Sequence, residues 1–381
     1  MSKRAKSSSS EQAKSGRSVE TEQAAGRTDR LGGLGRSPLR GHQHIWQALI
    51  QAESRGRLGH AYLFTGPRGV GKCLLAHQWA KYLLCESPQR AANGQACGVC
   101  VACRYFDAGT HPDFFYVCKP PEKHELPIDL IRELCGKPHP DLDADSRLAG
   151  SLALKPLRGG YQIAVVDDAD DLSEAAANSF LKFLEEPPPR SLLILIGTEP
   201  ERQLPTIQSR CQVIQFGPLS AADLTALLHE HGVDEPGQVQ RLVQASGGSI
   251  GLALALNDAE LWAYLQRLTG QLAQPYPDTP QIAREMWAFV EAAGKESAAQ
   301  RQRAALVVRL LVDWLMERVR RLAGGEADPE RPGWLQIDTV LELVERCLQA
   351  DRQLTRRVQL VLVIDALADA FARPRPTRPR A

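Results

Sequence analysis

The sequence has no long hydrophobic run and almost no net charge. No uninterrupted apolar stretch approaches the roughly 18 to 20 residues that span a bilayer, and the N-terminus has no apolar core of a secretory signal. The formal net charge is only +1, so the overall charge gives no reason to expect a nucleic-acid-binding protein. These absences predict a cytoplasmic protein without a membrane segment, in which any DNA affinity comes from local patches or from partners.

The composition is that of an ordinary globular protein. Its 381 residues are 43% hydrophobic and 24% charged, which allows a large core and two or three domains. Nine cysteines are present. Because thiols stay reduced in the cytoplasm, we do not interpret them as disulfides.

The chain divides into five segments by composition and periodicity. Residues 1–38 are polar and basic with few large apolar side chains, so we expect a disordered arm, and 373–381 form a basic tail rich in proline. Residues 39–217 alternate buried-strand patterns with amphipathic helices, which predicts an α/β domain with a parallel sheet. Residues 218–275 predict a small helical domain, and 276–372 a second, all-helical domain with apolar residues at helical spacing.

A phosphate-binding loop is predicted within Tyr62–Leu75, which reads YLFTGPRGVGKCLL. In the pattern GxxxxGK[ST], glycines let backbone N–H groups converge on phosphate oxygens and the lysine meets the phosphate charge. Gly66, Gly69, Gly71 and Lys72 fill these positions. A buried strand precedes the loop and a helix follows it, as such a loop requires. A Gly-rich turn without a ligand is the alternative.

The last position of this motif is Cys73, where the pattern has serine or threonine. That hydroxyl normally binds Mg²⁺, and a thiol is not a hard oxygen ligand. We therefore expect ATP with Mg²⁺ to bind weakly if at all, and the sequence leaves open whether the chain hydrolyses ATP.

Four cysteines form a cluster directly after the helix of the loop. Their spacing, C-x11-C-x2-C-x2-C, places four reduced thiols in one short segment, where they can bind Zn²⁺ tetrahedrally. No position would remain for water, so we predict a structural zinc site in a module over 85–103; buried cysteines without a metal are the alternative. The predicted ligands are Cys85, Cys97, Cys100 and Cys103, whereas Cys118, Cys135, Cys211 and Cys347 are predicted to be packing residues.

Acidic residues follow a second buried strand, in the segment YQIAVVDD. In a phosphate-loop protein Asp167 would lie beside Mg²⁺ and Asp168 would polarise the attacking water, although glutamate is usual at the second position. The alternative is two acids with no catalytic role. A helix is predicted after them, with Asp171 as its N-cap.

Two further residues follow as candidates for the catalytic site. Thr198 comes after the next buried strand, at the sheet edge where a phosphate would lie. Arg210 follows a short polar turn in LPTIQSRCQVIQF. It is either a plain surface charge or a guanidinium that reaches the phosphates of a neighbouring subunit.

Together these motifs resemble a known family. The chain is similar to the AAA+ clamp-loader subunits of bacterial DNA polymerase III over most of residues 42–257. The likeness rests on the segments HAYLFTGPRGVGK, CGVCVACRYFDAGTHPDFFYV, GGYQIAVVDDADDLSEAAANSFLKFLEEPP and LPTIQSRCQVIQF. It implies an AAA+ phosphate-loop domain with an inserted zinc module, then a lid domain (218–275) and a collar domain (276–372). Members usually have a continuous helix where this chain has a polar insertion, at about 136–148.

Within the family, the chain resembles the delta-prime subunit and not the gamma/tau motor. The motor has an arginine in its lid that senses ATP, and this chain has Gly251 at that position, in the segment GGSIG. Cys73 and Gly251 therefore stand where the motor has its Mg²⁺-binding hydroxyl and its lid arginine, whereas Arg210 is kept. The resemblance implies a stator that gives Arg210 in trans to a neighbouring ATPase subunit, with Asp167, Asp168 and Thr198 as remnants of an ATPase site.

The resemblance also implies partners and a process. The chain would join gamma/tau and delta subunits in a hetero-pentamer that uses ATP to load the sliding clamp on primed DNA. It would be a component of a DNA-directed DNA polymerase holoenzyme, a nucleotidyltransferase complex, without a polymerase site of its own. An ATP-hydrolysing gamma/tau-type motor and a small-molecule phosphotransferase are the alternatives. A phosphotransferase would leave the SRC and cysteine motifs unexplained.

Overall fold

A computed structural model describes residues 39–371 except 121–122, 124, 127, 136–151, 153–154, 159, 275–276 and 325–336. The predicted arm (1–38), the predicted tail (373–381) and the predicted insertion (136–148) lie outside the described residues. Two compact units are present. One comprises the residues up to Leu227 together with Gly248–Ile250, and the other comprises Leu228–Gly247 and the chain from Gly251 onward.

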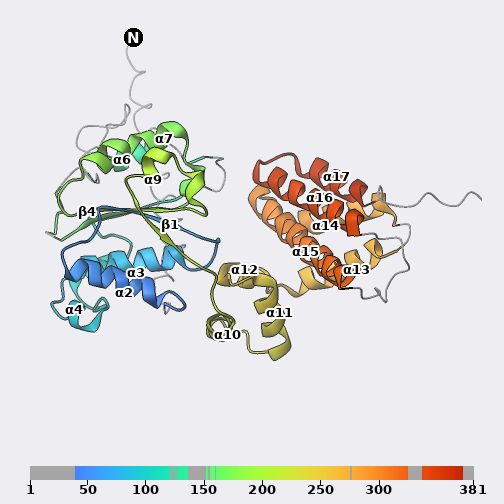
Figure 1. Ribbon diagram of the computed structural model, residues 1–381, viewed down its shortest axis with the longest axis horizontal. Helices are drawn as coiled ribbons and strands as arrows, with labels where there is room; N and C mark the ends of the chain where they lie inside the picture. The colour runs from blue at the N-terminus through green and yellow to red at the C-terminus, as the bar shows by residue number, and fades with distance from the viewer. Residues whose placement is uncertain are drawn as a thin grey trace, which may run out of the picture. The chain divides into compact units, whose positions relative to one another are not determined.

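The first unit is built on a parallel β-sheet (Figure 1). Its strands lie in the order β2-β3-β4-β1-β5, and every neighbouring pair is parallel. Their bounds are Ala61–Thr65 (β1), Phe114–Val117 (β2), Gln162–Val166 (β3), Ser191–Ile196 (β4) and Gln212–Gln215 (β5). The predicted α/β fold with a parallel sheet is therefore confirmed.

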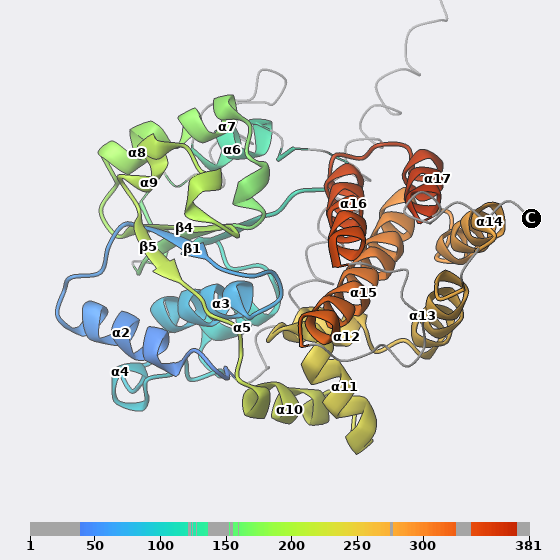
Figure 2. The ribbon, with the colours of Figure 1, turned by 45° about the vertical axis from the view of Figure 1, so that its right-hand side comes forward.

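Helices cover both faces of the sheet (Figures 1 and 2). Successive side chains of a strand point to opposite faces: Ile163 and Val165 of β3 belong to one apolar core, and Ala164 and Val166 belong to the other. The first core includes α2 (Gln43–Ser54), α3 (Lys72–Leu84) and α5 (Val101–Asp107). The second includes α6 (Ile128–Leu134), α7 (Glu174–Ser179), α8 (Leu181–Glu185) and α9 (Pro205–Gln208). Short helical turns complete this unit at α4 (Arg90–Asn93), η2 (Ala169–Asp171) and η3 (Pro200–Arg202).

The N-cap predicted at Asp171 is wrong. Ser173 caps α7, because its side chain accepts a hydrogen bond of 3.2 Å from Ala176 N. The Asp171 carboxylate instead forms an ion pair with Lys119. Both residue types are common N-caps. Asp171 is the last residue of η2, and α7 begins only at Glu174, so Ser173 and not Asp171 lies directly before the helix.

Three helices follow the last strand. They are α10 (Ala221–Glu230), α11 (Pro236–Ser246) and α12 (Ile250–Ala255). The chain breaks between α11 and α12 at Gly247 and Gly248. Gly247 ends α11 with a φ of 57°, and a Cβ atom on Gly248 would lie 2.4 Å from Pro218 Cβ. Only glycine tolerates both the positive φ and the close approach.

The rest of the second unit is also helical. It contains α13 (Ala259–Leu272), α14 (Thr279–Glu291), α15 (Ser297–Ala323), α16 (Ile337–Thr355) and α17 (Leu360–Ala370). The apolar pattern after residue 335 gives two helices, because the chain turns at Arg357, whose φ is 56°. Arg301 stabilises this turn by donating to the carbonyls of Arg357 and Val358 at 3.3 and 2.9 Å. None of the helices in the described ranges is long and apolar enough to cross a membrane.

Candidate nucleotide and metal sites

The predicted phosphate loop lies between β1 and α3, at the carboxyl end of the sheet. Gly66, Gly69 and Gly71 have φ angles of 133°, 75° and 108°, which side chains rarely allow. A Cβ atom on Gly66 would lie 2.2 Å from the carbonyl oxygen of Phe216. The loop therefore requires glycine both for its backbone angles and for its closeness to the chain after β5.

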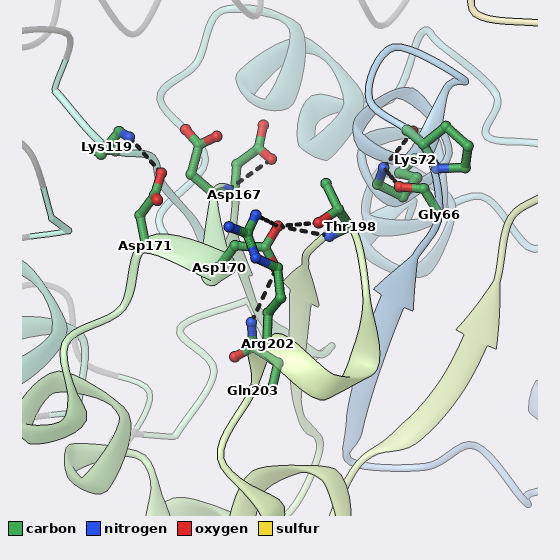
Figure 3. Close-up of polar contacts among 11 residues, drawn as sticks. Gly66, Lys72, Lys119, Asp167, Asp170, Asp171, Thr198, Arg202 and Gln203 are labelled. Carbon is green, nitrogen blue, oxygen red and sulfur yellow. Dashed lines mark hydrogen bonds and ion pairs between the residues drawn. The ribbon is translucent and has the colours of Figure 1, made fainter. Parts of the chain in front are cut away.

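Lys72 is the first residue of α3 and is only 6% exposed. Its Nζ donates to the carbonyl oxygens of Gly66 and Pro67 at 2.6 and 2.7 Å (Figure 3). Burial lowers the pKa of Lys72 to about 8, and the charges of Asp167 and Asp170 oppose this shift. In the part of the chain that the structure describes, Lys72 forms no ion pair.

The hydroxyl of Tyr116 contacts both Cys73 and Asp167. The Tyr116 hydroxyl donates to Asp167 Oδ2 at 3.0 Å, and Cys73 Sγ lies 3.7 Å from the same hydroxyl. Because the tyrosine proton points to Asp167, the thiol is the donor in the second contact. Burial, with the nearby Asp167 charge, raises the pKa of Cys73 far above its usual value, so the thiol stays protonated.

Asp168 stands next to Asp167 in a left-handed backbone conformation, with a φ of 55°. Its backbone N–H donates to Asp167 Oδ1 at 3.0 Å. Burial and the neighbouring Asp167 charge raise the pKa of the Asp168 carboxyl. Each oxygen of Asp167 thus has a donor from the protein itself.

Asp170 is a site residue that the sequence analysis missed, and its side chain is only 2% exposed. Its Oδ2 accepts from Thr198 N at 2.8 Å and from Thr198 Oγ1 at 2.7 Å, and its Oδ1 accepts from Gln203 at 3.3 Å. Arg202 lies 3.7 Å from the same carboxylate. Figure 3 shows Thr198 between Asp170 and the phosphate loop, and Gly66 N donates to Thr198 O at 2.8 Å. The predicted residue Thr198 therefore connects the two.

Arg210 does not join this group. It follows α9 and its side chain is 35% exposed. One guanidinium nitrogen pairs with Glu185 Oε1 at 2.9 Å, and another donates to Thr206 O at 3.1 Å. Among the described residues, no contact connects Arg210 with the phosphate loop of its own chain. The guanidinium lies at the surface, where a second molecule can reach it.

The four predicted zinc ligands lie together. Their Sγ atoms are all within 4.8 Å of one another, and Cys85 Sγ lies 4.0 Å from Cys100 Sγ. A tetrahedral ion with bonds of about 2.3 Å places its sulfur ligands about 3.8 Å apart, so the spacing fits. The Cys97 N–H donates to Cys85 Sγ and the Cys100 N–H donates to Cys97 Sγ, both at 3.3 Å. Bonds from the backbone N–H groups of Val99 and Cys100 lower the pKa of Cys97 to about 6. These four cysteines can hold a metal ion.

The chain resembles known proteins over part of its length. Residues 41–220 match the protein family described as DNA polymerase III, delta subunit. The chain is 40% identical over 210 residues to the delta' subunit of DNA polymerase III from Pseudomonas aeruginosa, and 33% identical over 232 residues to the delta' subunit from Escherichia coli. The tau subunit from Escherichia coli is 34% identical over 226 residues.

The chain is thus similar to subunits of bacterial DNA polymerase III over somewhat more than half of its length.

The likeness covers part of each protein. The matched regions make up 54% and 61% of this chain, and 58% and 64% of the Pseudomonas and Escherichia delta' subunits. For the tau subunit they make up 57% of this chain and 32% of the relative. The phosphate loop, the cysteine cluster and Arg210 all lie within the matched residues 41–220.

Asp113 of the HPD segment is a second residue that the sequence analysis did not assign. It is fully buried, and its carboxylate accepts from the backbone N–H groups of Leu157 and Arg158 at 2.7 and 3.0 Å. Arg158 in turn pairs at 2.7 Å with Glu86, the neighbour of the first cysteine in the cluster. Asp113 therefore fixes the segment before β3 against the metal module.

We predict that Asp113→Asn lowers the free energy of unfolding by about 1–3 kcal/mol. An amide has one acceptor oxygen, so one buried backbone N–H would face an NH₂ group instead. Urea-induced unfolding measures the change. Glu201→Gln, at an exposed position of the same unit, is the control and should change stability by less than about 0.5 kcal/mol. Equal stability of Asp113→Asn and the unsubstituted protein would contradict the structural role.

Proposed function

We propose that this chain acts in DNA replication as a clamp-loader subunit of the delta-prime type. The match over residues 41–220 and the two delta' relatives support this assignment. In this proposal it assembles with gamma/tau and delta subunits in a hetero-pentamer that loads the sliding clamp on primed DNA. It is a component of the polymerase holoenzyme and carries no polymerase site.

The fold proposed for the sheet-containing unit is AAA+. The strand order supports it, because β4 lies between the strand before the phosphate loop (β1) and the strand before Asp167 (β3). We propose that 39–217 form this domain, that 218–275 form the lid and that 276–372 form the collar. The break between α11 and α12 and the all-helical chain beyond it support this layout.

One contrast carries the proposal of a stator. Arg210 is present and reachable at the surface, whereas the chain's own ATPase site has Cys73 in place of a hydroxyl and Gly251 in place of a lid arginine. A subunit that lacks the residues for its own ATP hydrolysis can still contribute a catalytic residue to a neighbouring subunit. We propose that Arg210 contacts the phosphates of ATP held by the adjacent gamma/tau subunit, where a planar guanidinium stabilises the charge of the transition state.

The metal in the cysteine cluster is proposed to be zinc. Four thiolates are the ligand set of structural Zn²⁺, and with four protein ligands no position remains for water or substrate. The ion would supply no reaction chemistry. It would hold α4, α5 and the loop between them in place beside the sheet.

Isolated protein is expected to hydrolyse ATP only at background rate, because a protonated thiol is a poor Mg²⁺ ligand. A steady-state phosphate-release assay measures this, and Lys72→Ala should leave the rate unchanged. Rapid turnover that Lys72→Ala abolishes would instead identify a gamma/tau-type motor.

Assembly tests the proposed function directly. The full chain, mixed with purified gamma/tau and delta subunits, should co-elute with them as one complex on size-exclusion chromatography. The complex should load a sliding clamp on primed DNA, and a mixture without this chain should not. Failure to co-elute would overturn the proposal.

A further inference from the structure

The residues around the phosphate loop do not fit a magnesium ion. Magnesium needs hard oxygen ligands, and a phosphate loop supplies them as a hydroxyl in the first helical turn and a carboxylate at a neighbouring strand end. Here the first position is the partly buried thiol of Cys73. The carboxylate of Asp167 accepts from the Tyr116 hydroxyl at one oxygen and from Asp168 N at the other. The Tyr116 hydroxyl therefore contacts both Cys73 and Asp167, the two positions that would hold the ion.

The part of the loop that contacts phosphate is complete in the same structure. Gly66, Gly69 and Gly71 have the required backbone angles, and the 13-residue helix α3 begins at the end of the loop. The N-terminus of such a helix carries partial positive charge.

The buried Lys72 points to an anionic ligand. The residue is only 6% exposed, and two carbonyl oxygens accept from its ammonium. An ammonium has three donors and a full charge, and carbonyl groups leave that charge without a counterion. A phosphate oxygen would supply the counterion.

We propose that the loop from Gly66 to Lys72 binds a diphosphate group as a metal-free anion, and that Tyr116 and Cys73 exclude magnesium from the site. The proposal rests on the phosphate-loop assignment above and extends it by naming the state of the ligand. The shared chemistry is a diphosphate, either that of a nucleoside diphosphate or inorganic pyrophosphate.

The loop is already held in its binding shape. Ser249 Oγ donates to the carbonyl of Arg68 at 2.8 Å, and His42 Nε2 donates to that of Val70 at 2.9 Å. Both contacts use carbonyl oxygens. The Gly66 N–H donates to Thr198 O at 2.8 Å, and the two carbonyl contacts leave the backbone N–H groups from Arg68 to Lys72 to the ligand. A preformed loop loses less conformational entropy when the ligand binds.

The charges near the loop favour a diphosphate over a triphosphate. Lys72 is influenced by the charges of Asp167 and Asp170, and Asp168 lies beside Asp167. A third phosphate carries an additional negative charge into the range of these carboxylates. Magnesium normally neutralises that charge, and without it the repulsion remains.

The test is calorimetric titration of the full chain with ADP and, separately, with pyrophosphate. The buffer is freed of magnesium by a chelating resin, so that no soluble chelator competes for the cysteine-bound metal. We expect ADP to bind without magnesium, ATP to bind at least about 10-fold more weakly, and excess Mg²⁺ to give no tightening. Pyrophosphate binding with equal affinity would assign the ligand as the bare diphosphate, and weaker binding would assign it as the nucleotide. Binding that requires Mg²⁺, or no binding at all, overturns the proposal.

Three variants locate the effect. Lys72→Ala should abolish binding, and retained binding would place the ligand elsewhere and overturn the proposal. The double variant Cys73→Thr with Tyr116→Phe supplies a hydroxyl and frees Asp167, so Mg²⁺ should now tighten ADP binding at least about 10-fold. Tyr105→Phe, at an exposed tyrosine, is the matched control and should behave like the unsubstituted protein. Thermal unfolding of each variant confirms that it is folded.

The pH dependence gives a second readout that does not need substitutions. Lys72 faces Asp167, Asp170, Arg68 and Cys73, and burial lowers the pKa of its ammonium to about 8. Above this pH the free protein loses the charge that holds the anion, so affinity should fall as the pH rises through 8. Affinity that is constant from pH 7 to pH 9.5 would exclude Lys72 as the counterion. Because these titrations use the isolated chain, their failure leaves the loader assembly experiment unaffected.

Discussion

Replacement of Arg210 by alanine should leave the clamp-loader complex intact and sharply reduce its DNA-stimulated ATP hydrolysis and clamp loading. Arginine fingers contribute about 10³ to 10⁵ in rate where they have been best studied, and a complex with several ATP sites will lose less overall. Assembly should be unaffected, because the proposed collar lies in the second unit and Arg210 lies in the first. Steady-state ATPase and clamp-loading assays on the reconstituted complex measure both effects.

Two further substitutions separate a catalytic role from a structural one. Arg210→Lys should restore little activity, since an ammonium keeps the charge without the planar fork of donors. Glu185→Gln is the matched control, because it removes the charge of the 2.9 Å ion pair but leaves the guanidinium in place. Its complex should load clamps at close to the normal rate, since exposed ion pairs contribute little to stability. If Arg210→Ala also loads clamps normally, Arg210 is only a surface charge.

Protein purified without a chelator should contain one zinc ion per chain, and Cys100→Ser should lose it. The helices near the cluster are short, with 4 residues in α4 and 7 in α5, and Val99 and Val101 are exposed at 69% and 49%. Helices this short are not stable alone. Structural zinc provides about 10–16 kcal/mol of apparent binding energy in zinc-finger peptides, so loss of the ion should unfold the module.

Elemental analysis and limited proteolysis of the module measure this pair of effects. Cys211→Ser is the control, because Cys211 belongs to the apolar packing of the sheet and lies outside the cluster. It should keep one zinc ion per chain and the normal proteolysis pattern. Folded protein with a zinc content near zero would contradict the site.

The phosphate loop, the cysteine cluster and the parallel sheet could be predicted because each depends on residues close in sequence. Glycine spacing defines a loop, and buried strand patterns define a parallel sheet. The state of the site depends on distant pairs instead. Tyr116 meets Cys73 across 43 residues and Asp167 across 51, so no local pattern indicates that a tyrosine occupies the place of a metal contact.

Other misses have the same cause. Asp113 meets its partners 44 and 45 residues further along the chain, and Asp170 binds Thr198 across 28 residues. The turn at Arg357 has no local sequence signal either, because its positive φ falls on a residue other than glycine and its carbonyl accepts from Arg301, 56 residues away. Sequence identified the residue types of the site, and tertiary contacts determined their chemistry.

The strand order also determines when each strand can pair with its neighbours during synthesis of the chain. Among the described strands, β1 pairs with β4 and β5, and the partner of Ala61 is Leu193, which the ribosome makes 132 residues later. At about 5–20 residues per second, that interval lasts roughly 7 to 26 s. During this time the apolar segment AYLFT has neither neighbour, although β2 and β3 can already pair. The nascent chain therefore exposes the strand before its phosphate loop for longer than any other strand of the sheet, and this strand is where a chaperone would be needed most.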